Sequence, residues 1–539
     1  MSEESLIETR KQKHQEINSG TYPLPAKGSN ILRVMDLNYY FNEYNTLIPS
    51  SLNLDEFIGD AKHDVRVCGR VRLFRKSGSI AFITLADQTG AIQLIFSKAN
   101  SPSYDKIKLI DLGDIIDISG YVCYSKTGER SIFVMQWTVL TKATRPMPEK
   151  FTGLTDVETK YRKRYLDLIS SDESKSVFMV RSGIVSSIRK FMEADHFMEV
   201  ETSTLNSVVS GANAKPFSTH HNALNSELYL RIAPELYLKR LLVGGFDRVF
   251  EIGRNYRNEG LDTRHNPEFT MMEYYQAYGR FEELISRTEN MLRFIDSNCC
   301  KLLPEFVCSN YAEWKKTRPF TLDSFIEVSM RNAVINAASK AEMVLNSNLH
   351  SLLYEYIPNN KPDITISNPN NNRLSKIDMD GLTHDYIDAA TIGQRIAVLF
   401  EYIAEPFLIE DYRTDDNKYS LPVFITQHPK DVSPLARSFD KEPSLTERFE
   451  LYVDGRELAN AFQELNDPTE QALRFKEQLE LNNKDPMDFD EDYIQALEYG
   501  MPPAIGFGMG IDRLVQLLTN KSNIKDVILF PTLKPENNK

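Results

Sequence analysis

The chain has 539 residues, of which 41% are hydrophobic and 10% aromatic, a composition typical of soluble globular enzymes with two or more domains. It holds no run of about 18 apolar residues, and its first residues include neither a basic start nor an apolar stretch. We therefore expect neither a membrane span nor a secretory signal, and we expect a cytoplasmic protein. The five cysteines include no C-x-x-C pair, which argues against both a disulfide framework and a zinc site.

The net charge of −13 is unevenly distributed along the chain. Between residues 61 and 150, 14 Lys and Arg residues stand against 8 Asp and Glu residues, so this segment carries +6 and the remainder about −19. A basic module joined to an acidic body suggests that a polyanion binds at one end, while cations or amines bind at the other.

The first 60 residues hold one charged helix, expected over Ile7–Ile17, followed by a linker. From residue 61 to 145 the pattern changes to short strands, expected at 65–74, 80–86, 91–96, 115–124 and 131–140, with a helix at 104–112. Three strands, a helix and two strands are the order of a five-stranded oligonucleotide-binding barrel, or OB-fold.

Barrels of this kind bind single-stranded nucleic acid by stacking bases on aromatic side chains and following phosphates with basic ones. Phe82 is the candidate stacking platform and Gln93 the candidate base reader, with Arg70, Arg72 and Arg75 as a basic rim. For Phe82 the alternative is an ordinary core aromatic residue, and the local positive charge brings the two interpretations level.

The rest of the chain, from about residue 155, alternates helices with strands. A helix is expected over Lys175–Glu193, where apolar residues recur at helical spacing, followed by a strand at Phe197–Glu201. Residues 300–420 form a helical and irregular insertion that includes the asparagine-rich patch Asn368–Asn372. Regular alternation resumes at 422–425 and 448–465.

The densest cluster of charge lies in a predicted strand-loop-strand hairpin over residues 257–273, which contains Arg257, Arg264 and His265 together with carboxylates. Burying unpaired charges is costly, so the hairpin either faces a charged ligand or is an ordinary solvated surface. Far downstream, the run Gly506–Arg513 places three alternate glycines directly before a helix. Such a segment lets the backbone approach an anion at a helix start, and the two segments together predict a nucleoside triphosphate site.

The ionisable residues separate into two sets. Arginine matches phosphate geometry, so Arg257 and Arg513, with His265, are suited to a triphosphate, and the carboxylates Glu450 and Glu457 are suited to Mg²⁺ beside it.

Three further carboxylates, Glu235, Glu273 and Glu464, have apolar sequence neighbours where no phosphate would be tolerated. They would satisfy an amino acid with an α-ammonium and a second amine, which is lysine. Each glutamate taken alone could equally be an exposed surface charge. No Ser/His/Asp or Cys/His set is evident, and activation of a carboxylate by ATP needs none, because the protein supplies alignment and charge neutralisation.

The chain resembles the class II lysyl-tRNA synthetases over nearly its whole length outside residues 300–420. The matching segments are Lys160–Leu168, Pro216–Leu224, Ala233–Arg240, the hairpin at 257–273, Val432–Arg437 and Arg456–Asp467. One departure is Ser203, which stands where the first class II motif usually has proline.

The resemblance implies an α+β protein, with an N-terminal anticodon-binding barrel and a catalytic domain at 155–539 built on an antiparallel sheet flanked by helices, which pairs as a homodimer. Arg257 would hold the α-phosphate of ATP, His265 and Arg513 its outer phosphates, and Phe269 its adenine, with Mg²⁺ on Glu450 and Glu457. By the same resemblance, Glu259, Asn266 and Gly510 would complete the ATP site.

The same resemblance assigns the lysine pocket and the anticodon reader. Glu235 and Glu464 would bind the ε-ammonium and Glu273 the α-ammonium of L-lysine. The pocket would be completed by Gly211, Tyr275, Asn460 and Phe462. In the barrel, Phe82 and Gln93, with Arg70 and Arg75, would contact the anticodon of tRNA(Lys).

Three other interpretations are less consistent with these residues. An aspartyl or asparaginyl synthetase would need cationic groups in place of Glu235 and Glu464. A ligase that attaches lysine to a protein would lack the barrel. A regulatory protein without catalysis would have lost some of the phosphate-handling arginines or metal carboxylates, and all of these are present.

Overall fold

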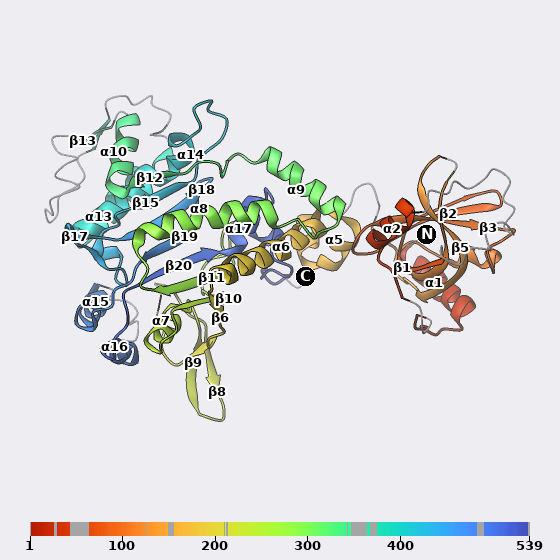
Figure 1. Cartoon of the computed structure of the whole chain (residues 1–539), viewed down its shortest axis with the longest axis horizontal. Coiled ribbons are helices and arrows are strands. Elements are labelled where there is room, and N and C mark those ends of the chain that lie inside the picture. The colour runs from red at the N-terminus through yellow and green to blue at the C-terminus, as the bar shows by residue number, and fades with distance from the viewer. Residues whose placement is uncertain are drawn as a thin grey trace. The chain divides into compact units, whose positions relative to one another are not determined.

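The computed structural model describes residues 2–25, 30–43, 64–125, 127–148, 156–209, 211, 214–341, 343–345, 364–366, 373, 376–481 and 490–536. The chain forms two compact units (Figure 1). One comprises residues 1–172 with 303–308, and the other comprises residues 173–302 with 309–539. No helix within the described ranges is both long enough and apolar enough to cross a bilayer.

The first unit contains a closed barrel with the strand order β1-β2-β3-β5-β4. Its strands are β1 (Asp64–Ser77), β2 (Ile80–Ala86), β3 (Ala91–Ser97), β4 (Ile115–Tyr124) and β5 (Arg130–Thr141). Only β3 and β5 pair in parallel. The predicted barrel is confirmed, but the helix expected at 104–112 is a shorter 3₁₀ helix, η3 (Tyr104–Leu109). It ends there because Ile110 is extended and Asp114 accepts a hydrogen bond from the Asp111 amide.

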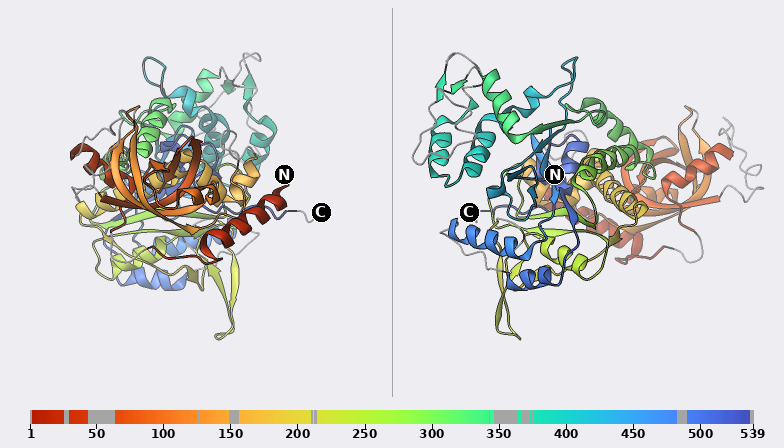
Figure 2. Two further views of the ribbon diagram at one scale, coloured as in Figure 1. Left: turned by 90° about the vertical axis from the view of Figure 1, so that its right-hand side faces the viewer. Right: turned by 60° about the vertical axis from the view of Figure 1, so that its left-hand side comes forward.

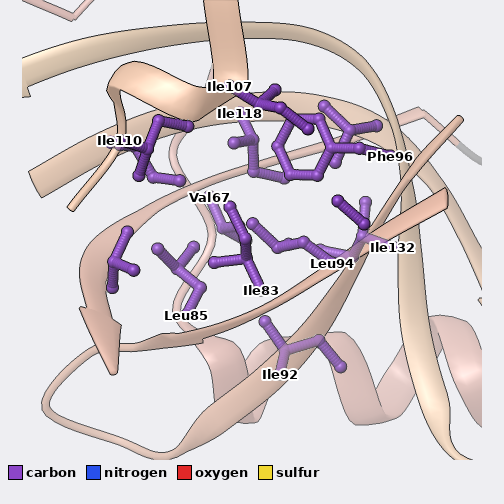
Figure 3. Packing of buried hydrophobic residues seen from close by; sticks show 14 of the residues in the cluster. Val67, Ile83, Leu85, Ile92, Leu94, Phe96, Ile107, Ile110, Ile118 and Ile132 are labelled. Carbon is purple, nitrogen blue, oxygen red and sulfur yellow. The ribbon is translucent and has the colours of Figure 1, made fainter. Parts of the chain in front are cut away.

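Alternation along the strands separates the two faces of the barrel. Side chains such as Val67, Ile83, Leu94 and Ile132 point inward and are completely buried (Figure 3). On the opposite face, Phe82 pairs across β2 and β3 with Ile95, which pairs in turn with Phe133 on β5. The barrel therefore has an aliphatic interior and a partly aromatic outer row.

Helix α1 (Glu3–Asn18) extends the predicted helix at both ends and is attached to the barrel. The Ser2 hydroxyl caps it by accepting a hydrogen bond from the Ser5 amide. Arg10 then donates to three backbone carbonyls of the barrel unit, at residues 112, 143 and 145. The remaining elements of this unit are η1 (Val34–Asp36), α2 (Leu37–Glu43), α4 (Val157–Arg162) and α5 (Arg164–Ser170).

The second unit is built on an eight-stranded sheet with the order β12-β15-β18-β19-β20-β11-β10-β6. All pairings are antiparallel except those of the two edge strands. The strands are β6 (Met198–Glu199), β10 (Arg248–Tyr256), β11 (Glu268–Ala277), β12 (Ile326–Ser329), β15 (Val423–Thr426), β18 (Arg448–Val453), β19 (Arg456–Gln463) and β20 (Ala504–Gly510). The strand expected at 197–201 is thus reduced to two residues.

Helices cover one face of this sheet and leave room for a cavity on the other. Helix α8 (Phe281–Asn298) lies against β19 and β20, and α6 (Asp172–Ala194) runs beside it (Figure 1). On that face Tyr274 stacks on Phe507, and the guanidinium of Arg287 from α8 covers the Tyr274 ring. Because strand residues alternate, Glu273 and Tyr275 of β11 point to the opposite face.

The remaining elements flank the sheet. A small sheet of β7 (Leu205–Asn206), β8 (Ser218–His221) and β9 (Ser226–Leu230) ends in a hairpin that extends from this unit (Figure 2). Before β7, the Ser203 hydroxyl hydrogen-bonds both the amide and the carbonyl of Leu205, which holds the turn in place of a proline. Other elements are α7 (Glu235–Val243), β16 (Ser438–Phe439), β17 (Glu442–Thr446), α15 (Pro468–Leu481), α16 (Glu491–Glu498), α17 (Ile511–Leu518), η7 (Lys430–Val432) and η8 (Ile524–Asp526).

The segment expected to be a helical and irregular insertion contains more regular structure than predicted. Its strand β12 is an edge strand of the main sheet, and its helices bury a common core against β15 and β18. The elements are α9 (Glu305–Thr317), α10 (Met330–Lys340), β13 (Met343–Leu345), β14 (Ile364–Ile366), α12 (Met379–Asp388), α13 (Ile392–Leu399), the π-helix η5 (Phe400–Ala404), η6 (Glu405–Phe407) and α14 (Leu408–Asp411). The patch Asn368–Asn372 lies outside the described residues.

Candidate active site

A cavity of about 670 Å³ lies on the face of the sheet opposite α8. This volume is in the range of sites that enclose a ligand of nucleotide size. Most of the predicted site residues line it, namely Gly211, Glu235, Arg257, Glu259, His265, Asn266, Phe269, Glu273, Tyr275, Glu457, Asn460, Phe462, Gly510 and Arg513. Of the described residues predicted for the site, Glu450 and Glu464 do not line the cavity but contact residues around it.

The three alternate glycines of β20 form part of the cavity floor. Gly506, Gly508 and Gly510 share one face of the strand and pair with β11. A Cβ atom on Gly506 would lie 1.9 Å from Glu464 Oε1, whereas one on Gly508 would meet its nearest atom at 3.4 Å. The glycine pattern therefore creates space for a buried carboxylate as well as for a ligand.

Arg257 provides an unpaired cationic group at one end of the cavity. Its guanidinium lies over the Phe269 ring at 5.2 Å, and Nε is buried with no hydrogen-bond partner among the described residues. Burial lowers the pKa of Arg257, although the nearby carboxylates of Glu259 and Glu457 oppose this effect. A buried arginine with an unused donor is suited to an anionic ligand.

The hairpin loop holds His265, and helix α17 brings Arg513 next to it. Asp262 accepts hydrogen bonds from the amides of Arg264 and His265, and its Oδ2 lies 2.7 Å from His265 Nδ1. Partial burial opposes ionisation, but the hydrogen bonds from His265 and the backbone lower the pKa of Asp262. Arg513, in the first turn of α17, lies 3.3 Å from His265 Nε2. The two segments singled out in the sequence therefore meet in one place.

The two candidate metal ligands lie on adjacent strands. Glu450 on β18 accepts hydrogen bonds from Arg448 at 2.6 Å and from the Tyr452 hydroxyl at 2.9 Å. Glu457 on β19 lies 3.4 Å from Arg513, and its pKa is raised by burial and by the nearby Glu450 carboxylate. Two mutually repelling carboxylates are a donor set that a hard divalent cation would satisfy.

A complete metal site does not arise from the protein alone. Throughout the described part of the chain, no three His, Cys, Asp or Glu side chains are grouped so as to hold a metal ion. Mg²⁺ is ordinarily bound by one or two carboxylates together with phosphate oxygens and water. The pair Glu450 and Glu457 fits that arrangement. The five cysteines are free thiols, as expected.

Three carboxylates gather at the other end of the cavity. Glu235 begins α7, and one turn later Lys239 places its ammonium 2.7 Å from Glu235 and 2.5 Å from Glu464. Lys239 and Glu464 are completely buried. Burial disfavours a charged lysine, but the two carboxylates outweigh this effect and raise the pKa of Lys239. Burial also raises the pKa of Glu464 well above its ordinary value.

Glu273 is the third member of this group. It is 5% exposed, and its Oε2 accepts a 3.2 Å hydrogen bond from the Tyr275 hydroxyl. Burial, with a smaller contribution from Glu235, raises the pKa of Glu273 to about 8, while Tyr275 and Arg257 oppose the shift. The cavity therefore has an acidic end and a cationic end joined by Glu273.

The sequence interpretation missed several residues of this site. Arg448 lines the cavity and donates to both Asn460 and Glu450. Asp512 accepts a hydrogen bond from the Thr270 amide and forms an ion pair with Arg181. These two contacts join α17 to β11 and to α6. Both residues lie next to predicted residues in the sequence or on a neighbouring strand. The only available signal was that each of them is a charged residue close in the sequence to a predicted site residue, Glu450 or Arg513.

The barrel residues predicted to contact RNA have different environments. Phe82 is half-buried in a small cluster with Ile95, Cys123 and Phe133 on the outer face. Gln93 is 6% exposed, and its amide donates to the Ser131 hydroxyl at 3.0 Å. Phe82 thus presents part of its ring, whereas Gln93 already has one hydrogen-bond partner.

The predicted basic rim is only partly free. Arg75 is exposed near the end of β1. Arg70 donates to the Gly113 carbonyl at 2.8 Å, and Arg72 contacts both carboxylate oxygens of Asp172 at 2.8 Å. Among these three arginines, Arg75 is the one that the structure leaves facing solvent.

Comparison with known families agrees with this architecture. The family described as tRNA synthetases class II (D, K and N) matches residues 156–534, and the OB-fold nucleic acid binding domain matches residues 65–140. The fold and the site thus define a class II tRNA synthetase with an OB-fold domain.

Individual relatives narrow the family. The chain is 43% identical to a lysine–tRNA ligase of Enterobacter sp. strain 638 over 88% of this chain and 86% of that protein. It is 43% identical to one of Acinetobacter baylyi over 88% and 86%, and 42% identical to a heat-inducible lysine–tRNA ligase of Escherichia coli K12 over 88% and 87%. The chain belongs to the lysine–tRNA ligase family of class II synthetases.

Proposed function

We propose that this protein uses ATP to activate L-lysine and transfers it to the 3′ end of tRNA(Lys). The observation that carries this proposal is a single cavity with a carboxylate cluster at one end and Arg257, His265 and Arg513 at the other. A diamine with a carboxylate and a triphosphate fit these two ends by charge. An aspartate or asparagine side chain would find no cation beside Glu235 and Glu464 other than Lys239, which is already paired with both.

In the first step a lysine carboxylate oxygen forms a bond to the α-phosphorus of ATP, and the bond from that phosphorus to the bridging oxygen breaks. Lysyl-adenylate forms, and pyrophosphate leaves with the electron pair. In our proposal Arg257 neutralises charge at the α-phosphate, Phe269 stacks on adenine, and His265 with Arg513 binds the outer phosphates. Glu259, Asn266 and Gly510 would complete the nucleotide site. The protein acts by alignment and preorganised charge.

The lysine would lie between Glu273 and the buried pair. We assign the α-ammonium to Glu273 and the ε-ammonium to Glu235 and Glu464, with Gly211, Tyr275, Asn460 and Phe462 shaping the pocket. In the second step the terminal ribose hydroxyl attacks the lysyl carbonyl carbon, the acyl–phosphate bond breaks, and AMP leaves while the hydroxyl proton passes to solvent.

Glu450 and Glu457 would hold Mg²⁺ in this proposal, and the ion would neutralise phosphate charge when bound. Arg448 and Tyr452 hold Glu450 in place. Removal of divalent ions with a chelator is expected to stop adenylate formation, and added Mg²⁺ should restore it.

We further propose that the barrel binds the anticodon of tRNA(Lys), with Phe82 stacking on a base and Arg75 near the backbone. Arg70 and Gln93 would contribute once their present hydrogen bonds are exchanged. A homodimer and a cytoplasmic location complete the proposal, supported by the resemblance to the class II synthetases. Sedimentation of the purified full-length protein tests the dimer directly.

Lysine-dependent exchange of labelled pyrophosphate into ATP tests the proposed reaction, because it reports the reversible first step without tRNA. We expect exchange with lysine and none with aspartate or asparagine. Exchange driven by aspartate or asparagine would contradict the proposal. Absence of exchange with lysine in the presence of Mg²⁺ would contradict it as well.

A further inference from the structure

Lys239 is a completely buried cation that the proposed chemistry does not itself use. It does not line the cavity, yet its ammonium touches two of the carboxylates assigned to substrate, Glu235 at 2.7 Å and Glu464 at 2.5 Å. It also lies 5.5 Å from the centre of the Phe462 ring and 6.0 Å from that of Tyr493. These contacts hold the two carboxylates together in an apolar surrounding.

The charges at this end of the cavity do not balance. When all three carboxylates of Glu235, Glu273 and Glu464 are ionised, as binding of a doubly charged amine requires, they meet one ammonium of the protein, that of Lys239, which leaves two negative charges for the substrate. Two arginines also act on Glu273, but Arg257 faces the candidate phosphate site, and Arg231 is ion-paired with Glu251 at 2.6 Å. Two negative charges match the two ammonium groups of lysine, whereas three would leave one carboxylate without a partner.

We propose that Lys239 is a positioning and specificity-determining residue that adjusts the charge of the amino-acid pocket to a substrate with two ammonium groups. It acts through Glu235 and Glu464 and does not touch the reacting atoms. This inference rests on the proposed lysine-activating function.

The surroundings of Glu464 support a role beyond stability. Neither of its oxygens makes a well-oriented hydrogen bond within the described ranges, but Oε2 is ion-paired with Lys239, whereas Oε1 rests against Gly506, where a Cβ would fall 1.9 Å away. An ion pair kept only for stability would saturate both oxygens, because an unsatisfied buried acceptor is costly and an apolar replacement of the pair is often tolerated. Lys239 therefore holds one oxygen of Glu464 and leaves the other for the substrate.

Replacement of Lys239 by methionine removes the charge and keeps the length of the side chain. The clustered carboxylates would then repel one another, and a second one, in addition to Glu273, would take up a proton at neutral pH. Lysine could bind only after that proton is released. We therefore expect KM for lysine to rise by about 30-fold or more in the full-length enzyme, with kcat changed by less than about threefold and KM for ATP unchanged.

The pH profile distinguishes this role from a structural one. In the native enzyme, where Lys239 pairs with Glu235 and Glu464 and opposes their protonation, the proton to be released is that of Glu273, and KM for lysine should fall about tenfold per pH unit below its pKa. In Lys239→Met a second proton must leave, so the slope of log KM against pH should approach twice the native value. Burial raises the pKa values of the nearby phenol groups of Tyr275 and Tyr493. These two groups therefore do not titrate near neutral pH.

Lys142 offers a matched control in the barrel. It is also completely buried and lies 2.6 Å from Asp111 and 2.7 Å from Asp114, so Lys142→Met removes the same interactions away from the cavity. We expect this variant to lose thermal stability and to keep the native KM for lysine in the exchange assay. The double variant Lys239→Met/Glu235→Gln restores two negative charges, which the two ammonium groups of the substrate can pair.

Lysine-dependent exchange, measured between about pH 6 and pH 8 in the native enzyme and the variants, tests the proposed role of Lys239. Support would be a higher KM and a steeper slope in Lys239→Met, with the double variant regaining at least about fivefold in KM and the native slope. A folded Lys239→Met variant with the native KM for lysine and the native slope would overturn the inference. A double variant whose KM for lysine is no lower than that of Lys239→Met would also overturn it. Absence of exchange in the native enzyme would instead remove the proposed function itself.

Discussion

At the scale of single residues, burial determines the chemistry of the carboxylates in the cavity. Glu273 is 5% exposed, and its pKa is raised to about 8 by burial and by Glu235. An exposed glutamate would be charged at neutral pH, but Glu273 is largely protonated there until a cation binds. In the proposed function, the substrate ammonium would therefore displace a proton.

This shift predicts how lysine binding depends on pH. Glu273 is protonated below about pH 8 and charged above it, and only the charged form pairs with the α-ammonium. KM for lysine in the exchange reaction should fall as pH rises toward 8 and then level off. Glu273→Gln should raise KM and abolish the pH dependence. A native profile that is flat from about pH 6 to pH 8 would show that Glu273 is charged throughout.

Arg257 is predicted to act in the transition state and less in ground-state binding. Its Nε has no partner and its guanidinium packs on Phe269, so it is already in place for developing phosphate charge. Arg257→Ala should lower kcat for exchange by roughly 10²–10³-fold, the range found for removal of one such donor. KM for lysine should change little. Arg254→Ala, which replaces an exposed arginine on strand β10 just before Arg257 in the chain, serves as the control.

At the scale of elements, strand β20 shows how a glycine pattern shapes a site. Gly506 faces Glu464 and the Tyr275 ring, while Gly508 faces Met271 and Glu273 at ordinary contact distances. Neither glycine has a positive φ, so space and not backbone conformation requires glycine here. The helix after the strand then places Arg513 beside His265.

Two alanine variants in β20 test this difference. In Gly506→Ala the new methyl would lie 1.9 Å from Glu464 Oε1 and 2.6 Å from Tyr275 Cε1, so the carboxylate must move. We expect KM for lysine to rise by about 100-fold, because a displaced charge-assisted contact costs a few kcal/mol. Gly508→Ala meets nothing closer than 3.4 Å and should stay close to native. Equal effects in both variants would contradict the assigned role of Gly506.

At the scale of the whole molecule, the two compact units carry separable tasks. The catalytic unit contains every residue assigned to lysine and ATP, and the barrel unit contains those assigned to the anticodon. The exchange reaction therefore needs only the catalytic unit's site, whereas tRNA charging needs both.

Phe82 provides the test of this division. Phe82→Ala removes a half-buried ring on the outer face of the barrel and leaves the aliphatic interior intact. Base stacking on an aromatic side chain contributes about 1–3 kcal/mol, so KM for tRNA(Lys) in the charging reaction should rise roughly 5- to 150-fold. Lysine-dependent exchange should not change. A loss of exchange would show that Phe82 is a structural residue of the barrel.

Prediction from sequence succeeded for elements with strong local signals. The barrel strands alternate apolar and polar residues between turn residues, and β1 to β5 lie within a few residues of their predicted bounds. Prediction was weaker between residues 300 and 420. The edge strand β12 has four residues, too short to show a period, and its place in the sheet depends on pairing with β15, about 100 residues away.

By itself, the sequence determined the fold class, the two-part organisation and the residue types of the site, because periodicity, turn residues and the charged hairpin are local properties. Only the tertiary structure decided which charges meet. Lys239 is one helical turn from Glu235, but its contact with Glu464 depends on the packing of α7 against β10 and β11 of the main sheet. The pKa of Glu273 likewise depends on burial and on neighbours from distant segments. Burial and long-range pairing arise from the packed chain, and the order of residues does not record them directly.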